Sequence, residues 1–193
     1  MTKGEDTKFT ILRIGLDMAS KLGLENVSIG QLAKATKMSK SGLFAHFESK
    51  ENLQIQILNF AGESFTELVF APALEEKAGI PRIKALVNNW IDWSSGFSGG
   101  CIFVSASTEF SDRPGRVRDF ILMQQQDWVE SLSRLAQSAI KSGDFRKDID
   151  CDQFAFDLYS LLLGIFYYHQ MLQDANTGKR WEAALERLLT AYR

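Results

Sequence analysis

Apolar residues recur every three or four positions along nearly the whole chain, and this spacing predicts helices. The first run predicts a helix over residues 7–22, with Phe9, Leu12 and Leu16 among its inward positions. Two very short helices follow, over residues 29–35 and 39–47, and a fourth helix reaches about residue 72 with Leu68 on its inward face. Two short helices joined by a tight turn, with a longer helix on either side, predict a helix-turn-helix.

Serine precedes three of these helices. Ser28, Ser39 and Ser49 each stand where an N-cap accepts a hydrogen bond from the first turn of a helix. Gln31 completes a capping-box pattern with Ser28, and Gly23 supplies a left-handed stop for the first helix. Local chemistry therefore predicts the ends of the short helices.

The remaining chain stays helical and becomes more aromatic. Helices are predicted over residues 82–94, 116–142, 152–173 and 181–192, with a short segment at 101–110. No stretch alternates with period two for long. We predict an all-α protein, with an N-terminal three-helix helix-turn-helix domain over residues 1–50 and a larger helical domain over residues 51–193.

Composition is that of a globular protein, and the charge is distributed unevenly; the alternative to a functional meaning is the chance variation that small segments often show. Of its 193 residues, 45% are hydrophobic and 24% charged, and the longest apolar stretch falls short of the roughly 18 residues of a membrane span. The start of the chain is polar, which favours a cytoplasmic protein without a membrane role. Residues 1–50 carry a balance of +3 and the remainder −5, so one end is expected to meet a polyanion.

The helix-turn-helix suggests that this polyanion is double-stranded DNA. Its second helix enters the major groove with its first residues nearest the bases, and these are Ser39, Lys40, Ser41 and Gly42. Helix N-termini bind phosphate, and His46 and Lys50 add donors. The alternative is that the three serines are only helix caps.

Residues 9–53 resemble the DNA-binding domain of TetR-family transcriptional regulators. The resemblance is carried by NVSIGQLAKATKMSKSGLFAHFESKENL, residues 26–53, and by its ending Phe47-x-x-Lys50-x-x-Leu53. It implies that Lys50 binds a phosphate, that His46 does likewise, and that residues 39–42 face the groove.

Two positions depart from the family pattern. Phe44 replaces the usual tyrosine, so a hydroxyl that reaches a phosphate is missing and a packing role near the DNA remains. Lys37 replaces the usual glycine of the turn, which costs about 1 kcal/mol if the backbone is unchanged but adds a cation near the groove. With Ser28, these residues complete the predicted DNA-binding set.

The resemblance also implies that the larger domain dimerises and binds a small molecule that alters DNA affinity. Broad apolar faces predict the dimer interface on residues 116–142 and 152–173; the alternative is that residues 158–168 are monomer core. Candidate pocket residues are aromatic, with two polar anchors: Trp90, Trp93, Phe97, Phe103, Glu109, Trp128, Phe166, Tyr168 and His169. Each aromatic has core packing as its alternative role. Their number favours a hydrophobic or aromatic effector.

Other chemistry is weakly supported. Residues 96–100 match G-x-S-x-G, but a helical stretch precedes them, so a loop is favoured over a hydrolase elbow. Two histidines and two cysteines lack metal-ligand spacing, and Cys101 is read as a buried thiol rather than a redox sensor. We expect no enzyme, cofactor or metal.

The sequence as a whole predicts a homodimeric repressor that a small effector releases from an inverted-repeat operator. The alternatives are a regulator that needs its ligand to bind DNA, and a helical enzyme or interaction module.

Overall fold

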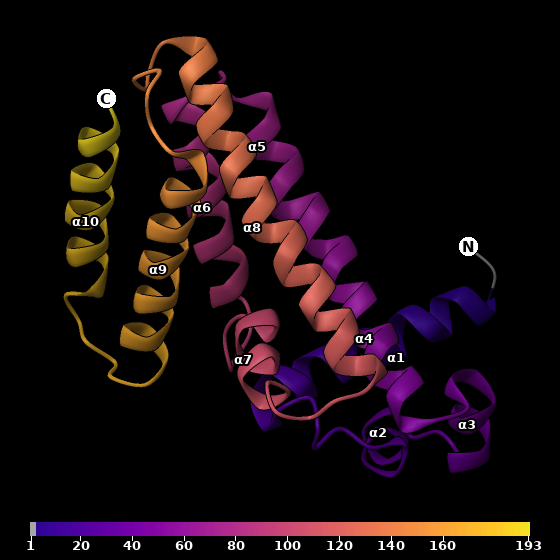
Figure 1. The fold of residues 1–193 in the computed structure, drawn as a ribbon. Helices are drawn as coiled ribbons and strands as arrows, with labels where there is room; N and C mark the ends of the chain where they lie inside the picture. The colour runs from indigo at the N-terminus through magenta and orange to yellow at the C-terminus, as the bar shows by residue number, and fades with distance from the viewer. Residues whose placement is uncertain (1–2) are drawn as a thin grey trace. The chain divides into compact units, whose positions relative to one another are not determined.

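Helices make up the regular secondary structure of residues 3–193, the part of the chain that this computed structural model describes, and that part contains no strand (Figure 1). The predicted all-α fold class is confirmed. In chain order the elements are α1 (Lys3–Leu22), α2 (Ile29–Thr36), α3 (Lys40–Phe47), α4 (Lys50–Phe65), the π-helical turn η1 (Thr66–Phe70), α5 (Ala71–Glu75), α6 (Ile80–Ser95), α7 (Ile102–Glu109), α8 (Arg116–Ser142), α9 (Cys151–Gln170) and α10 (Thr177–Tyr192).

The described chain divides into two compact units. The first holds everything up to Thr66 together with Ser94–Met123, and the second holds Glu67–Trp93 and Gln124–Arg193. In the first unit α1 packs on α2, α4 and α7, while α3 packs on α2 and α4. Leu32, Leu43, Phe47 and Leu53 are fully buried there. This packing holds α2 and α3 in place, because helices of two turns are not stable alone.

The inward face of α1 differs from the predicted one. Ile11 is 1% exposed, whereas Phe9 is 49% exposed and meets the ring of Phe60 edge-on at 5.2 Å. The helix also begins at Lys3, four residues before the predicted start. Its buried stripe follows Ile11, Leu12 and Leu16, which the prediction captured only in part.

The fourth helix was predicted to continue to residue 72, but it ends as an α-helix at Phe65 and passes into η1. Pro72 follows at the start of α5 and has no N–H with which to continue the α-helical bonding pattern. The wider π-helical turn changes which side chains face inward. Val69 is fully buried, and Leu68, predicted to face inward, is 55% exposed.

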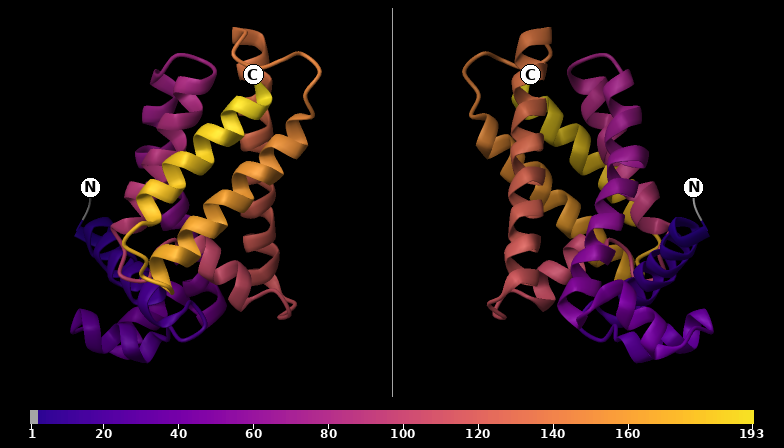
Figure 2. Two further views of the ribbon diagram at one scale, coloured as in Figure 1. Left: turned by 90° about the vertical axis from the view of Figure 1, so that its left-hand side faces the viewer. Right: turned by 90° about the vertical axis from the view of Figure 1, so that its right-hand side faces the viewer.

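In the second unit α9 and α10 lie side by side along their lengths, as both views of Figure 2 show. Asp150 caps α9 by accepting hydrogen bonds from the N–H groups of Asp152 and Gln153. The hydroxyl of Tyr192, at the end of α10, donates to Asp157 of α9 at 2.7 Å. α10 starts four residues earlier than predicted. No helix in the described part of the chain is long and apolar enough to cross a membrane.

Candidate nucleic-acid interface

The three predicted serine caps are all present. Ser28 Oγ accepts from the N–H of Gln31 at 3.2 Å, and the Gln31 side chain accepts from the N–H of Ser28 at 3.1 Å, which completes the capping box. Ser39 and Ser49 each accept from the N–H three residues ahead at 3.1 Å. Each cap satisfies one of the free N–H groups of a helix start. The other free N–H groups and the positive end of the helix dipole remain available to an anion.

Most candidate residues in and next to α3 are exposed. Leu43 and Phe47 are fully buried, whereas Lys40, Ser41, His46 and their neighbours Ser39 and Phe44 are exposed. The Phe44 ring is 57% exposed. The exposed residues of α3 and its N-cap therefore include two serines, a lysine, a histidine and one aromatic ring.

Lys40 lies back over the start of α2. A Cβ added to Gly30 would lie 3.5 Å from Cε of Lys40, 3.9 Å from its Nζ and 4.0 Å from Ser28 Oγ. The lysine ammonium is therefore close to the N-terminal end of α2. The ammonium and the N-terminal end of α2 both attract a phosphate. Lys40 was expected to face the bases; its position also allows a contact with the DNA phosphate backbone.

The turn between α2 and α3 has the left-handed residue expected of it. Lys37 has φ 55° and ψ 30°, its N–H donates to Lys34 O at 3.4 Å, and the N–H of Met38 donates to Ala33 O at 3.1 Å. These two bonds form a Schellman motif, which requires a left-handed residue at this place. The chain keeps a lysine where glycine would fit without strain.

Lys50 is not free of partners in this structure. Its Nζ donates to Glu25 Oε1 at 2.7 Å, and Gln54 Nε2 donates to Glu25 Oε2 at 3.2 Å. The hydrogen bond from Lys50, followed by the Gln54 bond and the charges of Lys50 and Arg113, holds the pKa of Glu25 below its usual range. This ion pair links the loop after α1 to the start of α4, and periodicity gave no signal of it.

Two family models match the chain. Residues 11–57 match bacterial regulatory proteins of the tetR family, and residues 79–185 match the tetracyclin repressor-like C-terminal domain. The chain belongs to the TetR family. It is a DNA-binding transcriptional regulator with a helix-turn-helix, as its sequence predicts.

Proteins of known name or structure resemble the chain over most of its length. The HTH-type transcriptional repressor DhaR of Mycobacterium sp. strain GP1 is 26% identical over 144 residues, covering 73% of this chain and 71% of DhaR. The crystal structure of SCO4454, a TetR-family transcriptional regulator from Streptomyces coelicolor, matches with a TM-score of 0.84 at 17% identity, covering 97% of this chain and 96% of that one. AibR, crystallised with isovaleryl coenzyme A and operator DNA, matches with a TM-score of 0.64 at 25% identity, covering 81% of this chain and 85% of that one.

The candidate effector residues of this TetR-family regulator are distributed over both units. Phe97, Phe103 and Glu109 belong to the first unit; Trp90, Trp93, Trp128, Phe166, Tyr168 and His169 belong to the second. Several serve as core. Phe103 packs edge-on against Phe65 at 6.0 Å, and Trp128 against Phe70 at 5.7 Å.

Glu109 has a role that its sequence context did not indicate. Its carboxylate accepts from the N–H of Leu24 at 2.8 Å and from the N–H of Glu25 at 3.1 Å. It therefore fixes the loop between α1 and α2 to the end of α7. Its role as an effector anchor stays a prediction.

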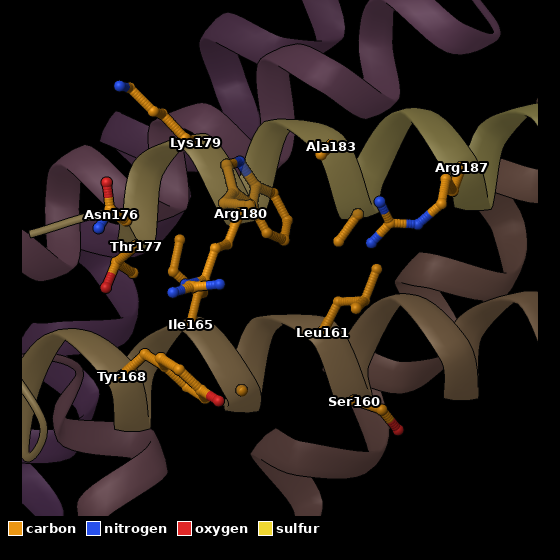
Figure 3. Close-up of a pocket in the computed structure, with 13 residues that line it drawn as sticks. Ser160, Leu161, Ile165, Tyr168, Asn176, Thr177, Lys179, Arg180, Ala183 and Arg187 are labelled. Atoms are coloured by element: carbon orange, nitrogen blue, oxygen red, sulfur yellow. The ribbon is translucent and has the colours of Figure 1, made fainter. Parts of the chain in front are cut away.

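A groove of about 670 Å³ lies between α9 and α10 (Figure 3). Of the candidate effector residues, Tyr168 lines it; the other lining residues lie on these two helices or at the start of α10. Arg180 and Arg187 extend from α10 toward Ile165 and Leu161 of α9, and Lys179 points away (Figure 3). Sequence reasoning missed this groove, because the residues that form it are separated by a loop and lie on two helices.

The remaining motifs have structural explanations. The G-x-S-x-G segment joins helices α6 and α7, and the N–H of its Gly99 donates to Ser20 Oγ of α1 at 2.9 Å. Cys101 is 1% exposed. Among the residues that the structure describes, no group of three or more His, Cys, Asp or Glu side chains is placed to hold a metal ion.

Proposed function

We propose that this TetR-family protein is a homodimeric repressor that binds an inverted-repeat operator and is released by a small hydrophobic or aromatic effector. Residues 1–50 would bind DNA, and residues 51–193 would dimerise and bind the effector. The observation that carries the proposal is that α2, α3 and α4 each begin at a serine N-cap and that Lys40, Ser41, Phe44 and His46 of α3 are exposed.

The exposed residues have distinct proposed roles. Ser39, Ser41 and Gly42 allow the backbone of α3 to approach the base edges closely. Phe44 packs against the DNA, and Lys40 contacts a phosphate beside the start of α2. The remaining proposed contacts with the DNA phosphate backbone are made by a helix end or by a side chain that carries a positive charge or donates a hydrogen bond. They belong to Ser28, Lys37, His46 and Lys50.

We infer a dimer interface formed by α9 and α10. Phe156, Leu163, Tyr167 and Met171 are between 39% and 70% exposed, and their spacing places them on one side of α9. The groove beside them is lined by small residues that include Gly164, Ala183 and Ala184. A partner helix fits against such a surface, as in a four-helix bundle. This proposal retains residues 152–173, which the sequence predicts as part of the interface. As the second interface helix it takes α10 instead of the predicted residues 116–142.

The relatives support the proposed sign of regulation. DhaR is named a repressor, and AibR was crystallised with a small acyl thioester and with operator DNA. An effector that favours a dimer with wrongly spaced recognition helices would lower operator affinity. A coupling of about 1–3 kcal/mol changes the affinity 5- to 150-fold, which is enough for release.

Selection of duplexes from a random library tests the DNA-binding part. The full-length protein is used at about 150 mM salt, so that nonspecific phosphate contacts are partly suppressed. We expect an enriched inverted repeat with half-sites about one helical turn, roughly 34 Å, or somewhat more apart. A folded dimer that enriches no sequence would contradict the proposal.

The interface is tested by Gly164→Arg. A Cβ at Gly164 would meet no atom within 4 Å, so the arginine fits the subunit but would block a partner helix. We expect a monomer in analytical ultracentrifugation. Gly178→Arg is the matched control, because its position in α10 is equally open and is not among the groove residues. A dimer that tolerates Gly164→Arg would exclude this interface.

A further inference from the structure

Glu25, in the loop between α1 and α2, contacts three side chains from other parts of the first unit. Its Oε1 accepts from Lys50 Nζ at 2.7 Å, and its Oε2 accepts from Gln54 Nε2 at 3.2 Å. The guanidinium of Arg113, from the connection between α7 and α8, lies 3.8 Å from Oε2. One carboxylate is thus shared between two cations.

The loop that carries Glu25 is held on two sides. Gln54 is only 2% exposed and also donates to Leu24 O at 3.1 Å, so its amide bridges the loop and the acid. The Glu109 carboxylate accepts from the N–H groups of Leu24 and Glu25. The loop is therefore fixed from α4 and from α7, and the Glu25 side chain, itself 37% exposed, keeps the buried Gln54 amide as a partner.

The two cations are less constrained. The side chain of Lys50 is 44% exposed and that of Arg113 is 54% exposed, and exposed ion pairs contribute little free energy. The Arg113 contact of 3.8 Å is also longer than a hydrogen bond. Lys50 can therefore exchange Glu25 for a stronger anion, and Arg113 is near enough to take its place.

We propose that Glu25 and Arg113 are positioning residues that control how readily Lys50 reaches a DNA phosphate. In free protein Glu25 holds Lys50; on the operator Lys50 moves to a phosphate and Arg113 closes on Glu25. The inference rests on the DNA-binding role proposed above. Because Arg113 stands between α7 and α8, the position of that connection would tune DNA affinity.

The test is a double-mutant cycle on the full-length protein, with the duplex recovered by selection as the probe. Arg113→Ala should weaken binding about two- to fivefold per subunit, the range of an exposed ion pair, because Glu25 then retains Lys50. Glu25→Gln should tighten binding. Arg116→Ala removes the same charge from the same segment and should have a smaller effect. Arg113→Lys should restore most of the affinity.

The decisive result is the Arg113→Ala effect in two further backgrounds. It should disappear when combined with Glu25→Gln, and also with Lys50→Ala. An equal loss in all three backgrounds would show that Arg113 binds DNA directly or acts on folding, and would overturn the proposal. The proposal would also be overturned if Glu25→Gln weakened DNA binding while its urea midpoint stayed unchanged. If wild-type protein selects no duplex, the proposed function itself fails and this inference with it.

Discussion

Replacing Lys37 by glycine should stabilise the protein and weaken its binding to DNA. Lys37 is exposed and has φ 55°, so the substitution relieves a strained backbone without removing a buried contact. The left-handed conformation costs an ordinary residue about 1–2 kcal/mol, and the added chain entropy of glycine in the unfolded state offsets about 0.4–1 kcal/mol of that. The free energy of unfolding should therefore rise by about 0.5–1 kcal/mol, or roughly 1–4 °C in melting temperature.

Lys34→Gly is the matched control. Lys34 is exposed and lies in the same helix, but its backbone is α-helical, so glycine there should lower the stability by about 0.7 kcal/mol. Urea unfolding of both variants should show that the free energy of unfolding rises in Lys37→Gly and falls in Lys34→Gly. Only Lys37→Gly should also reduce the salt slope of operator binding, by about 0.9 for each lost phosphate contact. If the two variants shift the urea midpoint in the same direction, the strain argument is wrong.

Three further substitutions test separate parts of the structure. Lys40→Ala should weaken binding to all duplex sequences alike and reduce the salt slope by about 1, whereas a changed consensus in the selection would show that Lys40 reads bases. Gly99→Ala would place a Cβ 1.7 Å from Ser20 O, so urea unfolding should show a loss of about 1–3 kcal/mol, and an unchanged midpoint would contradict this packing. Tyr192→Phe removes the hydrogen bond to Asp157 and should lower stability by about 1 kcal/mol without altering the selected sequence.

Features that depend on neighbouring residues could be predicted from the sequence. The serine caps and the capping box each involve atoms only a few residues apart, and the structure contains all of them. The left-handed residue at Lys37 was expected from the family resemblance, and the structure contains it as well. The helix that periodicity predicts over residues 116–142 coincides with α8 at both ends. It failed at η1, where the register changes ahead of Pro72, because the period of a continuous α-helix no longer applies.

Contacts between distant residues left no trace in the sequence pattern. Glu109 lies 85 residues from Leu24, to which it bonds, and an isolated carboxylate beside aromatic residues resembled an effector anchor equally well. Aromatic residues were ambiguous for a related reason. A core and a ligand pocket require the same apolar side chains, so Trp128 and Phe103 carried no signal that distinguished the two.

Two departures from ordinary backbone preference lie at the ends of α3. Of the non-glycine residues with positive φ in residues 3–193, Lys37 precedes α3 at 55° and Glu48 follows it at 61°; the third is Gln173. Such strain persists only where the surrounding structure fixes it, and it gathers at functional sites. Here the fully buried Leu43 and Phe47 anchor α3 between the two strained residues. A glycine at either position would adopt the same backbone without strain. The two departures together fit the proposal that the position of α3 is constrained by what it binds.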